Sequence, residues 1–143
     1  MYDNILRIET KKIDDKYRII LPKFTGVEIE EELCLILRQD YLEIRSIESV
    51  INELERLKEE LKKANNYEID AFYQEKINGI TSCFKGSVKV DKQRRIIIGR
   101  EIVEAYKLDE GIKVEGAVDS IRIWNLNKFL EYQNNNWTKL SRK

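Results

Sequence analysis

An internal repeat limits the folds that are open to this chain. The segment Lys12–Pro22, KIDDKYRIILP, aligns without a gap with Lys89–Gly99, KVDKQRRIIIG. Both segments read basic, apolar, aspartate, a mixed stretch, arginine and then large aliphatic residues. After a two-residue shift the match resumes further along, where DYLEI at 40–44 corresponds to DSIRI at 119–123. We interpret the chain as a tandem duplication, because similarity at a fixed spacing is the signature of repeated structural units.

Each copy predicts four short strands followed by a helix. The triplets at 19–21 and 96–98 are aliphatic, largely β-branched and bounded by turn residues, which is typical of buried strands. The alternating segments at 42–44 and 121–124 are typical of strands with one side in solvent. A unit of about 40 residues with four short strands cannot bury both faces of its sheet alone. We therefore expect an α+β, mainly β fold in which the copies form one interleaved, pseudo-dimeric β-barrel with swapped hairpins.

A helical insert is predicted between the copies. From Ile47 to Ala64 apolar residues recur at helical spacing opposite a charged face, and Ser46 stands where a helix cap is expected, as Asn125 does in the second copy. Asn65–Asn66 breaks this helix, and a second helical stretch is expected to end at Gly79. We expect the insert either to pack as part of the core or to form a contact between subunits. The predicted organisation is a first repeat at 1–48, the insert at 49–82, a second repeat at 83–132 and a polar, partly disordered tail at 133–143.

Composition excludes several classes of function. The 143 residues suit one compact domain or two very small ones, and they include no histidine. A Ser–His or Cys–His nucleophile pair, an ordinary zinc site and an imidazole base are therefore absent. Cys34 and Cys83 show no metal-ligand spacing, and Cys34 lies in an apolar run that indicates a core position. We expect no enzyme activity, catalytic residue, metal ion, cofactor or small-molecule substrate.

The pattern of charge and hydropathy predicts a cytoplasmic protein with no membrane partner. No apolar run approaches the roughly 20 residues that a membrane-spanning helix needs, and the first residues do not have the pattern of a secretory signal. The chain has 26 Lys and Arg against 26 Asp and Glu, yet the charges are unevenly spread. Basic residues outnumber acidic ones by five to two between 11 and 23, and by six to one between 85 and 100. These two basic stretches coincide with the repeated motif.

Each copy places an aspartate four residues before an arginine, as Asp14 and Arg18 and as Asp91 and Arg95. At the end of a β-hairpin, such a carboxylate can hold the guanidinium in one rotamer, and a guanidinium matches both a phosphate and the O6 and N7 edge of guanine. A single pair is most simply a surface turn of little energetic weight. Two pairs in basic surroundings favour the binding of an anion such as nucleic acid.

These segments resemble the twice-occurring Asp-x-x-x-Arg signature of the MraZ family, whose halves are related to AbrB-type DNA-binding domains. The resemblance covers about residues 8–132, including IRIW at 121–124 and the insert. It implies tandem AbrB-like repeats in a double-psi-like barrel, which bind double-stranded DNA at promoter direct repeats. It also implies a nucleoid-associated bacterial repressor of the division and cell-wall gene cluster, whose chains form a homo-oligomeric ring. Together with the basic surroundings it predicts DNA contacts by Lys11, Lys12, Asp14, Lys16, Arg18, Lys89, Asp91, Lys92, Arg94 and Arg95.

The chain departs from the family pattern at three positions. Tyr17 and Arg94 stand where the family usually has glycine before the motif arginine. Where that position takes a positive φ, each non-glycine residue costs about 1 to 2 kcal/mol, so we expect the shape of the turns to be affected. Gly99 stands where the family usually has proline in the second copy.

Other functions stay open at this point. An AbrB-like transition-state regulator or antitoxin would use the same turns, although those proteins usually carry one copy in each chain. A non-enzymatic assembly protein would bind an acidic partner through the basic turns. An enzyme built on Asp14 and Asp15 is disfavoured, because neighbouring strand residues point to opposite faces. Salt-dependent retention on heparin or random duplex DNA separates DNA binding from the other classes.

Overall fold

The computed structural model describes residues 8–141, so the first seven residues of the predicted first repeat and the last two of the predicted tail lie outside the described part. The strands are β1 (Ile8–Lys11), β2 (Arg18–Ile20), β3 (Glu32–Leu37), β4 (Leu42–Ser46), β5 (Phe84–Lys89), β6 (Arg95–Ile97), β7 (Ile112–Gly116) and β8 (Ile121–Asn125). The helices are α1 (Ile47–Lys62), α2 (Tyr67–Thr81), α3 (Arg100–Tyr106) and α4 (Leu126–Ser141), with short 3-10 turns η2 (Lys23–Thr25) and η3 (Leu108–Glu110). The predicted α+β class is confirmed, and the large sheet is antiparallel. The expectation of a mainly β chain is wrong, because within residues 8–141 the four α-helices hold more residues than the eight strands.

Strands of the two copies pair with each other at four places, β1 with β7, β8 with β4, β3 with β5, and β2 with β6. Six strands form an antiparallel sheet in the order β1-β7-β8-β4-β3-β5, and β2 and β6 form a separate two-stranded ribbon. The first strand of each copy therefore lies in the half of the sheet that the other copy builds: β1 pairs with β7, and β5 pairs with β3. Corresponding residues face each other where like strands meet, as Ile19 faces Ile96 and Glu43 faces Arg122.

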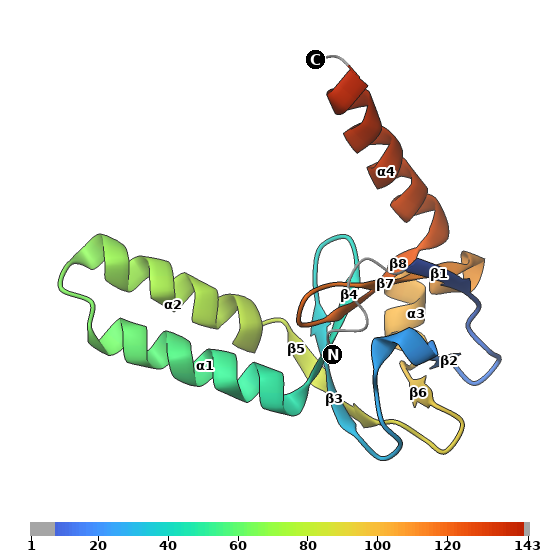
Figure 1. The fold of residues 1–143 in the computed structure, drawn as a ribbon, viewed down its shortest axis with the longest axis horizontal. Helices are drawn as coiled ribbons and strands as arrows, with labels where there is room; N and C mark the ends of the chain where they lie inside the picture. The colour runs from blue at the N-terminus through green and yellow to red at the C-terminus, as the bar shows by residue number, and fades with distance from the viewer. Residues whose placement is uncertain (1–7, 142–143) are drawn as a thin grey trace.

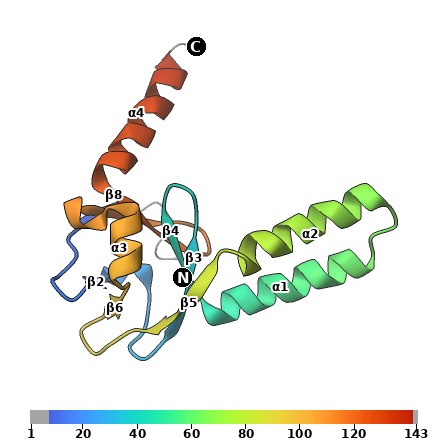
Figure 2. The ribbon, with the colours of Figure 1, turned by 180° about the vertical axis from the view of Figure 1, so that it is seen from behind.

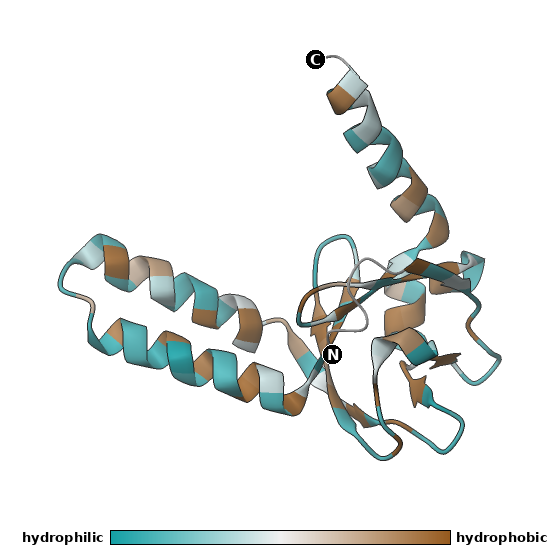
Figure 3. Cartoon of the chain, in the orientation of Figure 1, coloured by the Kyte–Doolittle hydropathy of each residue, from teal (hydrophilic) through white to brown (hydrophobic). Residues whose placement is uncertain are grey.

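The main core lies between the sheet, the ribbon and α3. Alternation along the ribbon strands sends Ile19 and Ile96 inward, where both are buried, and their neighbours outward. Figure 3 shows hydrophobic ribbon strands beside hydrophilic connecting turns. A second, smaller cluster contains Cys34, Val50 and Ile80 and joins β3 to the helices α1 and α2. The predicted core position of Cys34 is confirmed, since its side chain is 1% exposed.

The insert forms a helical hairpin that extends away from the strands (Figure 1). Its first helix begins as predicted, with the Ser46 hydroxyl accepting a hydrogen bond from the backbone N–H of Ser49 at 3.2 Å. The predicted stop at Gly79 is wrong, because α2 continues to Thr81. A glycine inside a helix costs only about 1 kcal/mol relative to alanine. Burial of the next residue, Ile80, outweighs that cost.

The C-terminal segment is helical where disorder was expected. Helix α4 runs to Ser141 and points away from the strands in a different direction from the helical hairpin, as both views show (Figures 1 and 2). Leu126, Leu130, Trp137 and Leu140 recur at helical spacing, and this stripe extends the amphipathic pattern through the asparagine-rich stretch. Beyond Phe129, which is buried, the stripe is exposed, and Trp137 is 70% exposed. Among residues 8–141, no helix has the length and apolar character needed to span a membrane.

Candidate nucleic-acid interface

Both predicted Asp–Arg pairs close tight turns. In turn 1, residues 14–18, one carboxylate oxygen of Asp14 accepts from the backbone N–H groups of Lys16 at 3.0 Å and Arg18 at 2.8 Å. The other oxygen accepts from Arg18 Nε at 2.8 Å. The backbone N–H of Asp14 donates to the carbonyl of Arg18 at 3.0 Å, and that of Tyr17 donates to the carbonyl of Asp14 at 3.1 Å. One carboxylate thus fixes both the backbone of the turn and the guanidinium.

Turn 2, residues 91–95, repeats this geometry. One oxygen of Asp91 accepts from the backbone N–H groups of Gln93 at 2.9 Å and Arg95 at 2.8 Å, and the other accepts from Arg95 Nε at 2.8 Å. The two backbone bonds across the turn measure 2.9 and 3.0 Å. Sequences that differ at the three central positions therefore form the same turn. The aspartate and the arginine, which the copies share, determine its shape.

Hydrogen bonds hold both aspartates in their charged form. Partial burial raises the pKa of Asp14, but the backbone N–H and guanidinium of Arg18 outweigh that effect, so the net pKa lies below its usual value. For Asp91 the backbone N–H of Arg95 is the largest cause, burial opposes it, and the pKa is again lowered. Each turn therefore keeps an ion pair between carboxylate and guanidinium at neutral pH.

The turns do not lie at the ends of paired hairpins, and this part of the prediction is wrong. Strand β1 pairs with β7 in the large sheet, while β2 pairs with β6 in the ribbon. The reason is the exchange of first strands between the copies, which leaves each turn to cross from one sheet to the other. Each motif arginine consequently begins a ribbon strand.

Tyr17 and Arg94 both take left-handed backbone conformations, with φ of 59° and 63°. The resemblance gives glycine at these positions, and each non-glycine residue here costs about 1 to 2 kcal/mol. The carbonyl of Tyr17 accepts from the backbone N–H of Ile98 at 2.9 Å, and that of Arg94 accepts from the N–H of Leu21 at 2.9 Å. Each strained residue therefore fastens its turn to the ribbon strand of the other copy. The non-glycine residues leave the two turns alike in shape.

The outer face of the ribbon combines the motif arginines with exposed isoleucines. Arg18 faces Ile97 across the ribbon, and Ile20 faces Arg95. Ile20 is 50% and Ile97 60% exposed, whereas the arginine side chains are 21% and 26% exposed. Each guanidinium uses Nε on its aspartate, and its terminal nitrogens make no hydrogen bond within residues 8–141. The face therefore offers two oriented guanidinium edges and two apolar contacts.

The predicted basic residues are only partly brought together. Lys12, Lys16, Lys89 and Lys92 are exposed, and Lys11 is half-buried and paired with Glu9 at 3.3 Å. Lys11, Lys92 and Arg94 line one groove of about 580 Å³, which we call the turn-2 groove. Lys12, Lys16 and Lys89 do not line this groove.

The turn-2 groove contains one basic residue that the motif does not include. Lys23, in the 3-10 turn after β2, is exposed and lines the groove with the three residues named above. The sequence holds one signal for it, because Lys23 is the last residue of the basic stretch at 11–23. Its place beside turn 2, which is remote in sequence, follows from the pairing of β2 with β6.

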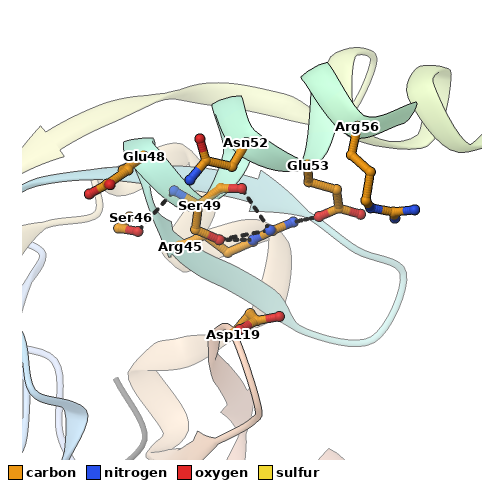
Figure 4. A pocket seen from close by; sticks show the side chains of 8 residues that line it. All are labelled: Arg45, Ser46, Glu48, Ser49, Asn52, Glu53, Arg56 and Asp119. Carbon is orange, nitrogen blue, oxygen red and sulfur yellow. Dashed lines mark hydrogen bonds and ion pairs between the residues drawn. The ribbon is translucent and has the colours of Figure 1, made fainter. Parts of the chain in front are cut away.

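A second polar groove, of about 540 Å³, lies where β4 enters α1 (Figure 4). Arg45 is buried there and donates from Nε and from a terminal nitrogen to the Ser49 hydroxyl at 3.1 and 2.7 Å, while its other terminal nitrogen pairs with Glu53. Glu43 is also buried and accepts from Arg38 at 3.0 Å. The expected solvent-facing side of β4 is therefore wrong, because α1 and these ion pairs cover it. The bonds from Arg45 to Ser49 and Glu53 attach α1 to the sheet.

Comparisons with protein families and with curated proteins found no match. Among residues 8–141, no group of three or more cysteines and carboxylates is placed to hold a metal ion. The duplicated turns and the ribbon between them are the features from which we infer a function.

Proposed function

We propose that this chain is a sequence-specific DNA-binding protein that contacts double-stranded DNA through the outer face of the β2–β6 ribbon. One observation carries the proposal: two matching turns orient Arg18 and Arg95 on a single narrow ribbon, beside exposed Ile20 and Ile97. The major groove admits a two-stranded ribbon, in which a guanidinium recognises guanine and an apolar side chain contacts the thymine methyl group. The aspartates act as positioning residues for the guanidinium groups.

The lysines serve a different purpose under this proposal. Lys12, Lys16, Lys89 and Lys92 lie in or next to the two turns and are exposed, so they can reach phosphates on either side of a bound ribbon. Phosphate contacts supply affinity and register, whereas base contacts supply specificity. The chain as a whole has no net charge, so this local excess of positive charge accounts for the attraction to DNA.

The resemblance extends the proposal to the fold and the biological role. The exchange of β1 and β5 between copies supports a swapped-hairpin, double-psi-like barrel of two AbrB-like repeats. We propose a nucleoid-associated repressor that acts at promoter direct repeats of the division and cell-wall gene cluster. The two turns in one chain favour this role over that of an AbrB-like regulator or antitoxin, which usually carries one copy per chain.

We also propose that the chain forms homo-oligomers, with a ring as the arrangement that the resemblance implies. Helix α4 corresponds to α1 by the repeat, and both helices begin with a side-chain cap, at Asn125 and Ser46. On α1, Val50 and Leu57 are buried in the cluster that includes Ile80 of α2, whereas Leu130, Trp137 and Leu140 on α4 are exposed. Light scattering tests the proposal. Trp137→Lys should shift the parent oligomer toward the monomer, and a parent that is monomeric at micromolar concentration would exclude it.

Fluorescence anisotropy with the duplex immediately upstream of the chain's own gene tests DNA binding. Replacing Arg18 and Arg95 together by alanine should cost about 1 to 3 kcal/mol for each arginine on the upstream duplex and much less on a shuffled duplex. Arg56→Ala is the control, since this exposed arginine lies on α1 and outside both turns.

A variant in which the turn has lost its structure must be distinguished from one in which the arginine no longer contacts the bases. Asp14→Asn leaves Arg18 in place and removes the ion pair, so it should weaken specific binding less than Arg18→Ala does. Circular dichroism and a thermal melt verify that each variant is folded. A double arginine variant that is folded and still discriminates the upstream duplex as the parent does would show that these arginines do not read bases. Absence of any DNA binding by the parent would favour an acidic protein partner.

A further inference from the structure

The two sides of the ribbon have the same backbone but different charge. Turn 2 docks beside β2 through the bond from the Leu21 N–H to the Arg94 carbonyl, and turn 1 docks beside β6 through the corresponding bond from Ile98 to Tyr17, both at 2.9 Å. The repeat therefore defines a turn-1 side that corresponds to the turn-2 groove. Any difference between the two sides arises from side chains.

The turn-2 groove carries an excess of positive charge. Its basic residues are Lys11, Lys23, Lys92 and Arg94, and its one acidic residue is Glu9, which pairs with Lys11. Within residues 8–141, the other three basic side chains have no acidic group within ion-pair distance. Three unpaired cations thus lie along one side of the ribbon.

The turn-1 side is close to neutral. At the positions that correspond to Lys11, Lys23, Lys92 and Arg94, the other copy has Val88, Arg100, Asp15 and Tyr17. Arg100 pairs with Glu104 at 2.8 Å, and the neighbouring Glu101 pairs with Lys85 at 3.1 Å. Lys16 remains as a cation there, and Asp15 next to it in the chain carries the opposite charge.

We infer that the turn-2 groove binds the phosphates of one DNA strand and so fixes a single orientation of the ribbon on DNA. The inference rests on the proposed DNA binding and adds a direction to it. With symmetric side chains the ribbon would bind equally well in either orientation and would read a palindrome. If the ribbon bound DNA in the reverse orientation, the neutral turn-1 side would take the place of the three unpaired cations. Binding would then be weaker, because counterion release scales with the number of phosphates neutralised. Each chain therefore reads a non-palindromic site.

Salt dependence of binding to a labelled 20-base-pair duplex of mixed sequence measures the contribution of each side. Lys23→Gln with Lys92→Gln should reduce the slope of log affinity against log salt by about two, since each lost phosphate contact lowers it by about 0.9. Lys16→Gln with Arg100→Gln removes the same charge from the turn-1 side and should reduce the slope by less than one. Equal reductions would overturn the inference and leave DNA binding intact, whereas a parent that binds no duplex would overturn the proposed function.

Orientation is measured directly by DNA cleavage from a tethered iron chelate. Gln93→Cys and Lys16→Cys place the reagent at corresponding positions of the two turns, in a Cys83→Ser background, on a site enriched from a random-sequence library. We expect each reagent to cut on one side of the site, with the two reagents on opposite sides. Cutting by each reagent on both sides with equal intensity would show that the ribbon binds in both orientations.

Discussion

Replacing Arg94 by glycine should stabilise the fold while weakening DNA binding. Arg94 has a φ of 63°, and glycine accepts this conformation without the steric cost that a β-carbon brings. The same side chain lines the turn-2 groove, where we place a phosphate. One substitution therefore moves stability and affinity in opposite directions.

The expected magnitude follows from two opposing effects. Relief of the left-handed conformation contributes about 1 to 2 kcal/mol, and the greater freedom of glycine in the unfolded chain removes about 0.5 to 1 kcal/mol. The midpoints of these two ranges give a net gain of about 0.75 kcal/mol, on the order of 2 to 3 °C in Tm for a chain of this size. Tyr17→Gly relieves the same strain but removes a ring that packs against the main core, so it should destabilise the fold.

Urea unfolding at one fixed protein concentration measures these differences, because self-association makes stability depend on concentration. Arg94→Ala is the matched control, since it removes the same side chain and keeps the left-handed backbone. The glycine variant should be more stable than the alanine variant by about 1 kcal/mol. If the alanine variant is equally stable, Arg94 carries no backbone strain and the reasoning is wrong.

Three further outcomes are expected. Asn at both Asp14 and Asp91 should lower Tm at neutral pH. Because the folded pKa of each aspartate lies below its unfolded value of about 3.9, the stabilisation is present above that pH and is lost as the pH falls through the folded pKa. The difference in Tm between parent and variant should therefore shrink on acidification, and a constant difference would contradict the ion-pair assignment. Gly99→Ala should destabilise the fold by about 1 to 3 kcal/mol, because Gly99 has a φ of 93°, whereas Gly79→Ala should stabilise α2 by about 0.5 to 1 kcal/mol. Both sites have open space for a methyl group, so the difference arises from the backbone. Shifts of the urea midpoint in the same direction for both variants would refute this. The Cys34 thiol, whose pKa is raised by burial and by Glu32, should resist a thiol reagent until the protein unfolds, and rapid labelling would show that the site opens in the native state.

The repeat predicted much of the fold, because strand pairing between copies depends on which residues need burial. The triplets around Ile19 and Ile96 had to face a common core, and they do. Local sequence patterns do not determine which strands pair between the copies. The prediction that the turns lie at the ends of paired hairpins was therefore wrong. Local signals also misjudged Gly79, where packing of Ile80 outweighs a weak helix former, and the tail, where a sparse apolar stripe continues α4.

The candidate site was predictable only where its contacts are local. Asp14 and Arg18 pair over four residues, so their spacing was enough to predict the ion pair. The groove that joins Lys23 to Lys92 depends on the pairing of β2 with β6 and could not be found from either segment alone. The difference in charge between the two sides of the ribbon became visible only when corresponding positions were placed in space.

The exchange of first strands also determines what the helical hairpin does for the chain. Each copy lacks a strand that only the other supplies, so either half alone would leave unpaired strand edges. The α1–α2 hairpin joins β4 to β5, and its tip near residues 63–66 lies far from the strands (Figure 1). It acts as a covalent tether that keeps two complementary halves at a high effective concentration. A dimer of separate chains must find its partner by diffusion, whereas here the stoichiometry of one first-copy turn to one second-copy turn is set by the covalent chain itself. That fixed stoichiometry allows the two turns to diverge in sequence, because each always meets the other and never a second copy of itself.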